Sequence, residues 1–179
     1  LAVFTSIGPG AVNTAVGVAT AYVDSTAVMV LTGAVHTHML GKGVLQEIER
    51  THWGDFPRVL APIVKRYWQV SQVKQLPSVM SNAFNHMLGG RPGPVLIDLP
   101  MDVQSDALDI DVGLLDGISQ GRKGRINAES DLIDDAVELL CKAKRPVILV
   151  GGGVNTAGAW DELREVAEML GAAVVTTMM

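Results

Sequence analysis

Short runs of consecutive apolar residues alternate with stretches of helical spacing along the first hundred positions. The runs at 1–6, 27–33 and 94–100 have the length of buried parallel strands, and 65–70 predicts a further strand. Residues 11–23 predict a helix that is apolar on nearly all sides and therefore buried. Residues 76–90 predict a helix that begins at Pro77 and ends at a glycine pair. This order predicts an α/β layered domain with a parallel sheet.

The pattern changes after residue 100. Residues 101–128 are polar, with scattered Asp and Gly, and predict a linker that lies over a surface. Residues 129–143 then predict an amphipathic helix, 145–154 a strand that runs into a glycine turn, 159–171 a helix, and 172–177 a strand. This is the first βαβ unit of a second, Rossmann-like domain. We therefore divide the chain into 1–107, a linker at 108–128, and 129–179.

Composition and charge narrow the classes of protein. Apolar residues make up 48% of the 179 residues, and the one cysteine excludes an internal disulfide and a multi-cysteine metal site. Residues 1–100 carry seven Lys and Arg and five Asp and Glu, whereas residues 101–179 carry seven Lys and Arg and fourteen Asp and Glu. Because acidic residues are in excess overall, we do not expect nucleic acid as a partner. No apolar run is long enough for a membrane span, and no signal peptide is visible. We expect a soluble, cytoplasmic protein.

Both ends of the chain resemble cut points. The first residue is Leu1 rather than a methionine, and the sequence stops within a strand-like run. We expect an internal piece of a longer protein.

The turn T-S-I-G-P-G-A-V-N at 5–13 is the first candidate site. Backbone amides at the start of a helix can hold an anion or a polar ring, and glycine lets a ligand approach closely. A plain strand-to-helix turn that needs special backbone angles explains Gly8, Pro9 and Gly10 equally well. Asn13 adds an amide to a small, apolar helix, where it either bonds the local backbone or faces a ligand.

The glycines Gly151, Gly152 and Gly153 form the second candidate site. They follow a strand and precede a helix, which is where a dinucleotide binds in Rossmann-like domains. The spacing departs from G-x-G-x-x-G, so a plain turn is the alternative.

Six other positions carry polar or charged side chains that could serve a site. His36 and His38 are two apart without a third ligand at metal spacing, so we expect no metal there. Glu47 is either catalytic or a solvated loop charge, and Lys65 with Arg66 predicts a solvated start of a strand. Asp98, inside an apolar run, needs a partner, and we expect a structural role.

Together these segments resemble thiamine-diphosphate-dependent enzymes of the acetolactate synthase type. The resemblance rests on G-P-G-A-V-N, the strand ending in T-G, L-Q-E at 45–47, R-P-G-P-V-L-I-D-L-P-M-D-V at 91–103, and R-P-V-I-L-V-G-G-G-V at 145–154. It implies that 1–107 is the latter part of the pyrimidine-binding domain. It also implies that 129–179 is the beginning of the central domain, which can hold FAD in some relatives.

The resemblance also implies roles for particular residues. Gly8, Pro9, Gly10 and Asn13 would lie beside the aminopyrimidine ring, and Gly151–Gly153 would be a possible FAD or nucleotide turn. Gln46 would face the substrate, and Lys65 would correspond to the family lysine that follows this segment ahead of the next strand. The substrate would be a 2-oxo acid or dicarbonyl, and the enzyme would be a homodimer or homotetramer with the cofactor between subunits.

The resemblance further implies that the chain is incomplete as a catalyst. The family glutamate that contacts the aminopyrimidine precedes position 1, and the ligands of Mg²⁺ and the diphosphate follow position 179, so we expect this chain alone to be inactive. Ile7, Ala34 and Leu45 differ from the usual synthase residues and leave a lyase, hydrolase, decarboxylase or other carboligase open. A nucleotide-binding module that uses the G-G-G turn, and a catalytically silent structural or regulatory relative, are the alternatives.

Overall fold

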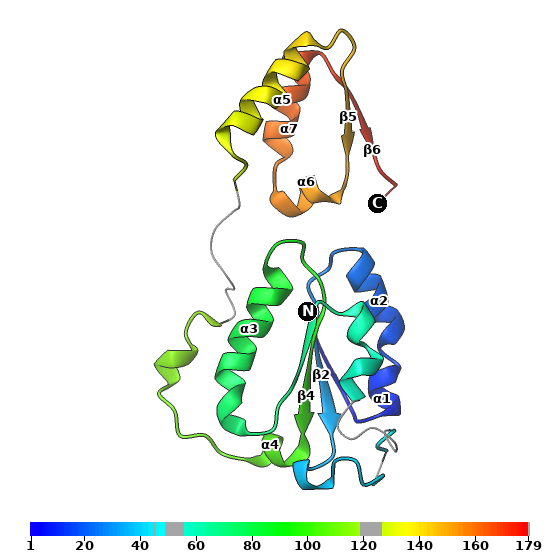
Figure 1. Cartoon of the computed structure of the whole chain (residues 1–179), viewed down its shortest axis with the longest axis vertical. Coiled ribbons are helices and arrows are strands. Elements are labelled where there is room, and N and C mark those ends of the chain that lie inside the picture. Colours follow the sequence, from blue (N-terminus) through cyan, green and yellow to red (C-terminus); the bar gives the residue numbers. More distant parts are fainter. Residues whose placement is uncertain (45, 49–55, 119–126, 179) are drawn as a thin grey trace. The chain divides into compact units, whose positions relative to one another are not determined.

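The computed structural model describes residues 1–44, 46–48, 56–118 and 127–178. The chain divides into two compact units, Leu1–Lys123 and Gly124–Met179, and each is described by itself (Figure 1). No helix in the described ranges is long and apolar enough to cross a lipid bilayer.

A four-stranded parallel sheet forms the centre of the first unit. Its strands are β1 (Ala2–Thr5), β2 (Met29–Ala34), β3 (Arg66–Gln69) and β4 (Val95–Pro100), in the spatial order β1-β2-β4-β3. The two central strands, β2 and β4, are buried along almost their whole length, as parallel strands between two helical layers should be. The α/β fold class and the parallel sheet expected from the sequence are therefore confirmed.

Helices cover the two faces of this sheet (Figure 1). Helix α3 (Leu76–Leu88) packs on one face, where Met29, Leu31, Val95 and Ile97 point from the central strands. Helices α1 (Pro9–Val12) and α2 (Ala15–Val23), with the short 3₁₀ turns η2 (Phe56–Val59) and η3 (Ala61–Ile63), lie at the other face. The unit therefore has three layers, with a hydrophobic core on each side of the sheet.

The single buried helix predicted over 11–23 is wrong. The segment forms two helices that break at Asn13 and Thr14, where the Thr14 hydroxyl donates a hydrogen bond to the carbonyl of Ala11. Such local bonding competes with helix continuation. Only Val18 and Ala21 of α2 are buried, and Val16 is 79% exposed. An apolar composition therefore did not make the helix buried.

The segment predicted as a polar linker from residue 101 begins with a helix. Residues Met101–Ser105 form α4, directly after β4, and Val103 is buried in the core under α3. The remaining short helices of the first unit are η1 (Thr37–Met39), η4 (Val73–Gln75) and η5 (Val112–Leu115). Residues 46–48 are irregular, and 45 and 49–55 lie outside the described residues.

The second unit contains the predicted βαβ pattern. Strands β5 (Val147–Val150) and β6 (Ala173–Thr176) are parallel, and α7 (Trp160–Leu170) connects them, with Gly171 as its C-cap. Helix α5 (Ser130–Lys142) precedes β5. The glycine turn is shorter than expected, because Gly152 and Gly153 already belong to a further helix, α6 (Gly152–Ala157). Among the described apolar residues of the second unit, only Val150 is buried.

Candidate active site

The candidate site lies at the carboxyl edge of the four-stranded sheet, where ligands bind in open α/β folds. The turn after β1 brings Gly8 to this edge as the N-cap of α1, with φ 59° and ψ −114°. Gly8 is buried, whereas Pro9 and Asn13 are exposed. The side chain of Asn13 is exposed at the break between α1 and α2. The exposed residues of the turn are therefore Pro9 and Asn13, whereas Ala11 between them is buried.

The loop after β2 packs directly on Gly8. A Cβ atom at Gly8 would overlap the carbonyl oxygen of Gln46 and would lie 3.4 Å from the side chain of Ile48. The structure thus brings together the two predicted segments, G-P-G and Q-E. The glycine at position 8 admits protein backbone, whereas the sequence left open a ligand contact or a plain turn.

Glu47 is hydrogen-bonded to the backbone of its own loop. Its carboxylate accepts hydrogen bonds from the backbone amides of Gly41 (2.6 Å) and Gly43 (2.9 Å), on the same loop. Gln46 itself is exposed, and Glu47 is half-buried. The carboxylate of Glu47 therefore closes the loop on itself, directly after Gln46, the residue predicted to face the substrate.

A row of polar side chains crosses the whole sheet near its carboxyl edge. Thr5, Thr32, Asp98 and Gln69 are register partners on the four adjacent strands. The Thr32 hydroxyl donates to Asp98 Oδ1 (2.7 Å), and Gln69 Nε2 donates to Asp98 Oδ2 (3.4 Å). The predicted partners of Asp98 are thereby found. At the end of the row, the buried hydroxyl of Thr5 has no hydrogen-bond partner among the described residues.

Asp102 joins α4 to the loop after β2. It accepts the backbone amide of Thr37 at 3.1 Å and also the Thr37 hydroxyl. Partial desolvation raises the pKa of Asp102, but the hydrogen bonds from Thr37 and Val103 outweigh it and hold this pKa below its ordinary value. Asp102 is therefore an ionised anchor at neutral pH.

Two hollows lie at this edge. A cavity of about 20 Å³ lies under the loop and is lined by Ile7, Gly8, Gly33, Leu40, Glu47 and Asp98, among others. That volume corresponds to about one water molecule. An open groove of about 650 Å³ lies between the ends of β3 and β4, with His36, Lys74, Asp102 and Asp106 on its walls.

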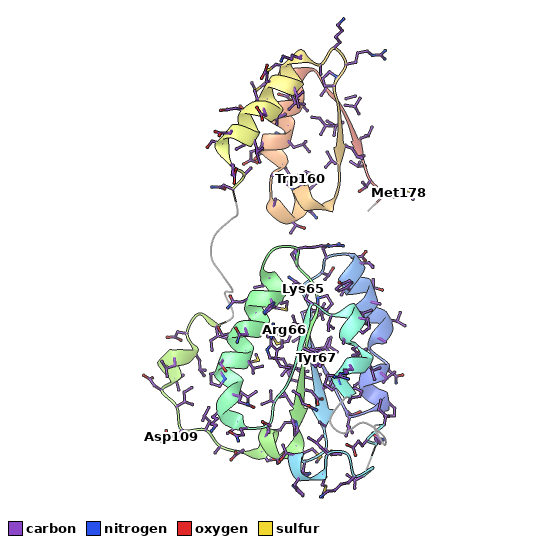
Figure 2. The ribbon with its side chains drawn as sticks, viewed as in Figure 1. Lys65, Arg66, Tyr67, Asp109, Trp160 and Met178 are labelled. Atoms are coloured by element: carbon purple, nitrogen blue, oxygen red, sulfur yellow. The ribbon has the colours of Figure 1, made fainter. Side chains whose placement is uncertain are left out.

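Lys65 lies at the opposite edge of the sheet (Figure 2). It precedes β3, and its ammonium group donates to the backbone carbonyls of Gly89 (2.7 Å) and Arg91 (2.8 Å), beyond the end of α3. Desolvation by burial lowers the pKa of Lys65. The structure does not bring Lys65 together with Gly8 or Gln46 in this unit, so its catalytic role stays a prediction.

The other sequence candidates are the two histidines and the glycine turn of the second unit. His36 precedes the 3₁₀ turn η1 and His38 lies within it, with their ring centroids 5.5 Å apart. The described residues contain no group of three or more potential metal ligands. Gly151 follows β5 in the second unit as the N-cap of α6, and Gly152 and Gly153 have open space where a Cβ would be. Their contact with a flavin or nucleotide stays a prediction.

Sequence reasoning missed the anchoring role of Asp102 and the polar row. Asp102 and Thr37 are 65 positions apart, so no local spacing signals their contact. The row had a usable signal in the sequence. Thr5, Thr32 and Asp98 are polar residues in the second half of three predicted strands, and each shares its face of the strand with the apolar residue two positions before it.

Two family models match the chain. Residues 1–53 match the "Thiamine pyrophosphate enzyme, N-terminal TPP binding domain", and residues 133–179 match the "Thiamine pyrophosphate enzyme, central domain". The first match includes the G-P-G turn and the loop that packs on it, and the second includes β5 to β6.

Curated relatives match nearly the whole chain. The chain is 41% identical over 174 residues to a "Probable acetolactate synthase large subunit" of Methanococcus aeolicus, covering 96% of this chain and 28% of that protein. It is 36% identical over 185 residues to "Acetolactate synthase isozyme 3 large subunit" of Escherichia coli, covering 99% of this chain and 30% of that protein. The chain therefore spans less than a third of the length of these relatives.

Proposed function

Because the chain belongs to the thiamine pyrophosphate enzymes, we propose that it forms part of an enzyme that makes or breaks a carbon–carbon bond next to a carbonyl group. The names of the relatives support a reaction of the acetolactate synthase type, for which we propose a 2-oxo acid or dicarbonyl as substrate. The observation that carries the proposal is the Gly8–Asn13 turn, which lies at the carboxyl edge of a parallel sheet, within the stretch matched as a thiamine pyrophosphate binding domain.

The residues at this edge fit an aminopyrimidine ring on the outer face of the turn. The cavity on the inner side, about 20 Å³, is too small for a ring, because the loop at Gln46 already covers it. The outer face offers the ring of Pro9, the backbone of Gly10 and the exposed amide of Asn13. An apolar wall with a single amide at its rim suits a flat heterocycle that needs one or two hydrogen bonds.

The remaining parts of the proposed site are divided between this chain and the rest of the enzyme. When bound, thiamine diphosphate would supply an electron sink for the carbonyl carbon of the substrate. Asn13 would orient the pyrimidine, and Gln46, exposed on the adjoining loop, would contact the substrate. We assign no Mg²⁺ ligand to the described residues, which contain no cluster of three potential ligands. The 179-residue chain alone would not turn over substrate.

The Asn13→Ala variant of the full-length enzyme tests this proposal. The concentration of thiamine diphosphate that gives half-maximal activity should rise about tenfold, the effect of one lost hydrogen bond. The unfolding temperature should not change, because Asn13 is exposed. The matched control is Asn82→Ala on the exposed face of α3. If both variants need the same cofactor concentration as the wild type, Asn13 does not contact the cofactor.

A further inference from the structure

The loop between β2 and Ile48 is attached to the rest of the first unit at its beginning. Asp102, in the first turn of α4, accepts both the amide and the hydroxyl of Thr37, three residues after the end of β2. The loop then turns at Gly41 and Gly43, which have φ values of 76° and 64°. Positive φ values at these two glycines turn neighbouring amides toward one side of the chain, where an anion can bind.

The anion that binds these amides is the carboxylate of Glu47. Each of its oxygens accepts one amide, from Gly41 and from Gly43, so the loop closes into a ring through a side chain. Charge-assisted hydrogen bonds of this kind are stronger than neutral ones. The backbone amide of Glu47 also donates to the carbonyl of Val44 (3.1 Å), which fixes the direction of the chain just before the carboxylate.

The closed loop places Gln46 against the turn after β1. The carbonyl oxygen of Gln46 fills the space beside Gly8 that a side chain would occupy, and Ile48 packs next to it. Gly8 is the N-cap of α1 and is buried, so its position depends on what presses against it. Gln46 cannot keep this contact if the preceding turn opens, because it is the direct chain neighbour of Glu47, whose carboxylate closes the turn.

We infer that Glu47 is a positioning residue: by binding the amides of Gly41 and Gly43, it holds Gln46 against Gly8 and sets the shape of the Gly8–Asn13 turn. The inference rests on the proposed function, since the turn is proposed to face thiamine diphosphate. Glu47 itself would not touch the cofactor, because its carboxylate is occupied by the two glycine amides.

The first test uses the 179-residue chain and no cofactor. Hydrogen–deuterium exchange at the amides of Gly41 and Gly43 should be faster in Glu47→Ala by about tenfold, the factor that corresponds to one lost hydrogen bond. Glu47→Gln retains one side-chain acceptor oxygen and should protect one of the two amides. The control is Glu165→Ala, on the exposed surface of α7, which should leave both rates unchanged. Unchanged exchange in Glu47→Ala would overturn the inference.

The second test uses the full-length enzyme. Glu47→Ala should raise the thiamine diphosphate concentration for half-maximal activity by about tenfold, with Glu47→Gln between it and the wild type. The unfolding temperature should stay unchanged, which separates positioning from a general loss of stability. Faster exchange with an unchanged cofactor requirement would overturn the positioning role. A wild-type enzyme whose activity does not depend on thiamine diphosphate would overturn the proposed function instead, and the exchange result would still stand.

Discussion

The place that a side chain at Gly8 would occupy is taken by the carbonyl oxygen of Gln46. This contact explains why position 8 needs glycine on two grounds, the backbone angles and the space. The sequence located the G-P-G turn correctly but could not distinguish a glycine that admits a ligand from one that admits the chain itself. The partner at Gln46 is 38 positions away, and nothing in the local pattern encodes that contact.

The Gly8→Ala substitution should therefore destabilise the first unit. Its backbone angles alone should cost about 1–3 kcal/mol, because alanine rarely adopts them, and displacing the backbone of Gln46 adds to this cost. The matched control is Gly17→Ala on α2, where no atom lies within 4 Å of the added Cβ. That change should stabilise by about 0.5–1 kcal/mol, as alanine does in a helix interior. Urea unfolding of the 179-residue chain measures the change in the free energy of unfolding for both variants. If both substitutions stabilise the chain, or both destabilise it, this explanation is contradicted.

At the scale of elements, the strands and the longer helices followed the sequence pattern, and the exceptions have local causes. All four strands of the first sheet and α3 lie within two residues of the predicted ranges. The helix predicted at 11–23 broke where Thr14 bonds the carbonyl of Ala11, and α4 formed because Val103 is buried under α3. Hydrophobic spacing identifies which segments pack, whereas short helices depend on single side-chain contacts that spacing does not report.

The junction between α4 and the loop after β2 should depend on pH. The pKa of Asp102 is lower in the folded state than in the unfolded chain, so the ionised carboxylate stabilises the fold above about pH 4. This contribution is lost as the pH falls through the folded-state pKa. Asp102→Asn should cost about 1 kcal/mol at pH 7, since one amide oxygen still accepts and the site is partly solvated, and the cost should shrink at pH 3.

Unfolding free energies measured from pH 3 to pH 7 check this expectation. Asp109→Asn is the matched control, because Asp109 is exposed on the segment between α4 and η5 (Figure 2). Its substitution should change the free energy of unfolding by only a few tenths of a kcal/mol. A destabilisation by Asp102→Asn that is the same at pH 3 and pH 7 would mean that its charge contributes nothing.

At the scale of the whole molecule, the two units differ in how much core they possess. The first unit has a buried cluster on each face of its sheet, whereas Val150 is the sole buried apolar residue described in the second. Leu132, Leu139 and Leu149 are at least 60% exposed. The division into domains at 107 and 129 stays a prediction, because core content by itself does not define a domain boundary.

We expect the two units to unfold separately in the 179-residue chain. Backbone amides of β2 and β4 should exchange at least about a hundredfold more slowly than those of β5 and β6, because local stability follows buried apolar contact. Hydrogen–deuterium exchange followed by peptide mass spectrometry measures both sets in one sample. Equal protection of β4 and β5 would show that the second unit is as stable as the first.

The polar row across the sheet has a consequence for the accuracy of folding. Val30 and Leu96 point to the same face as Thr32 and Asp98, and the residues between them point to the core under α3. A strand that paired one residue out of step would turn Asp98 into that core, away from Thr32 and Gln69. An unpartnered carboxylate there would cost several kcal/mol. The row therefore rejects misaligned sheets during folding, independently of any role in catalysis.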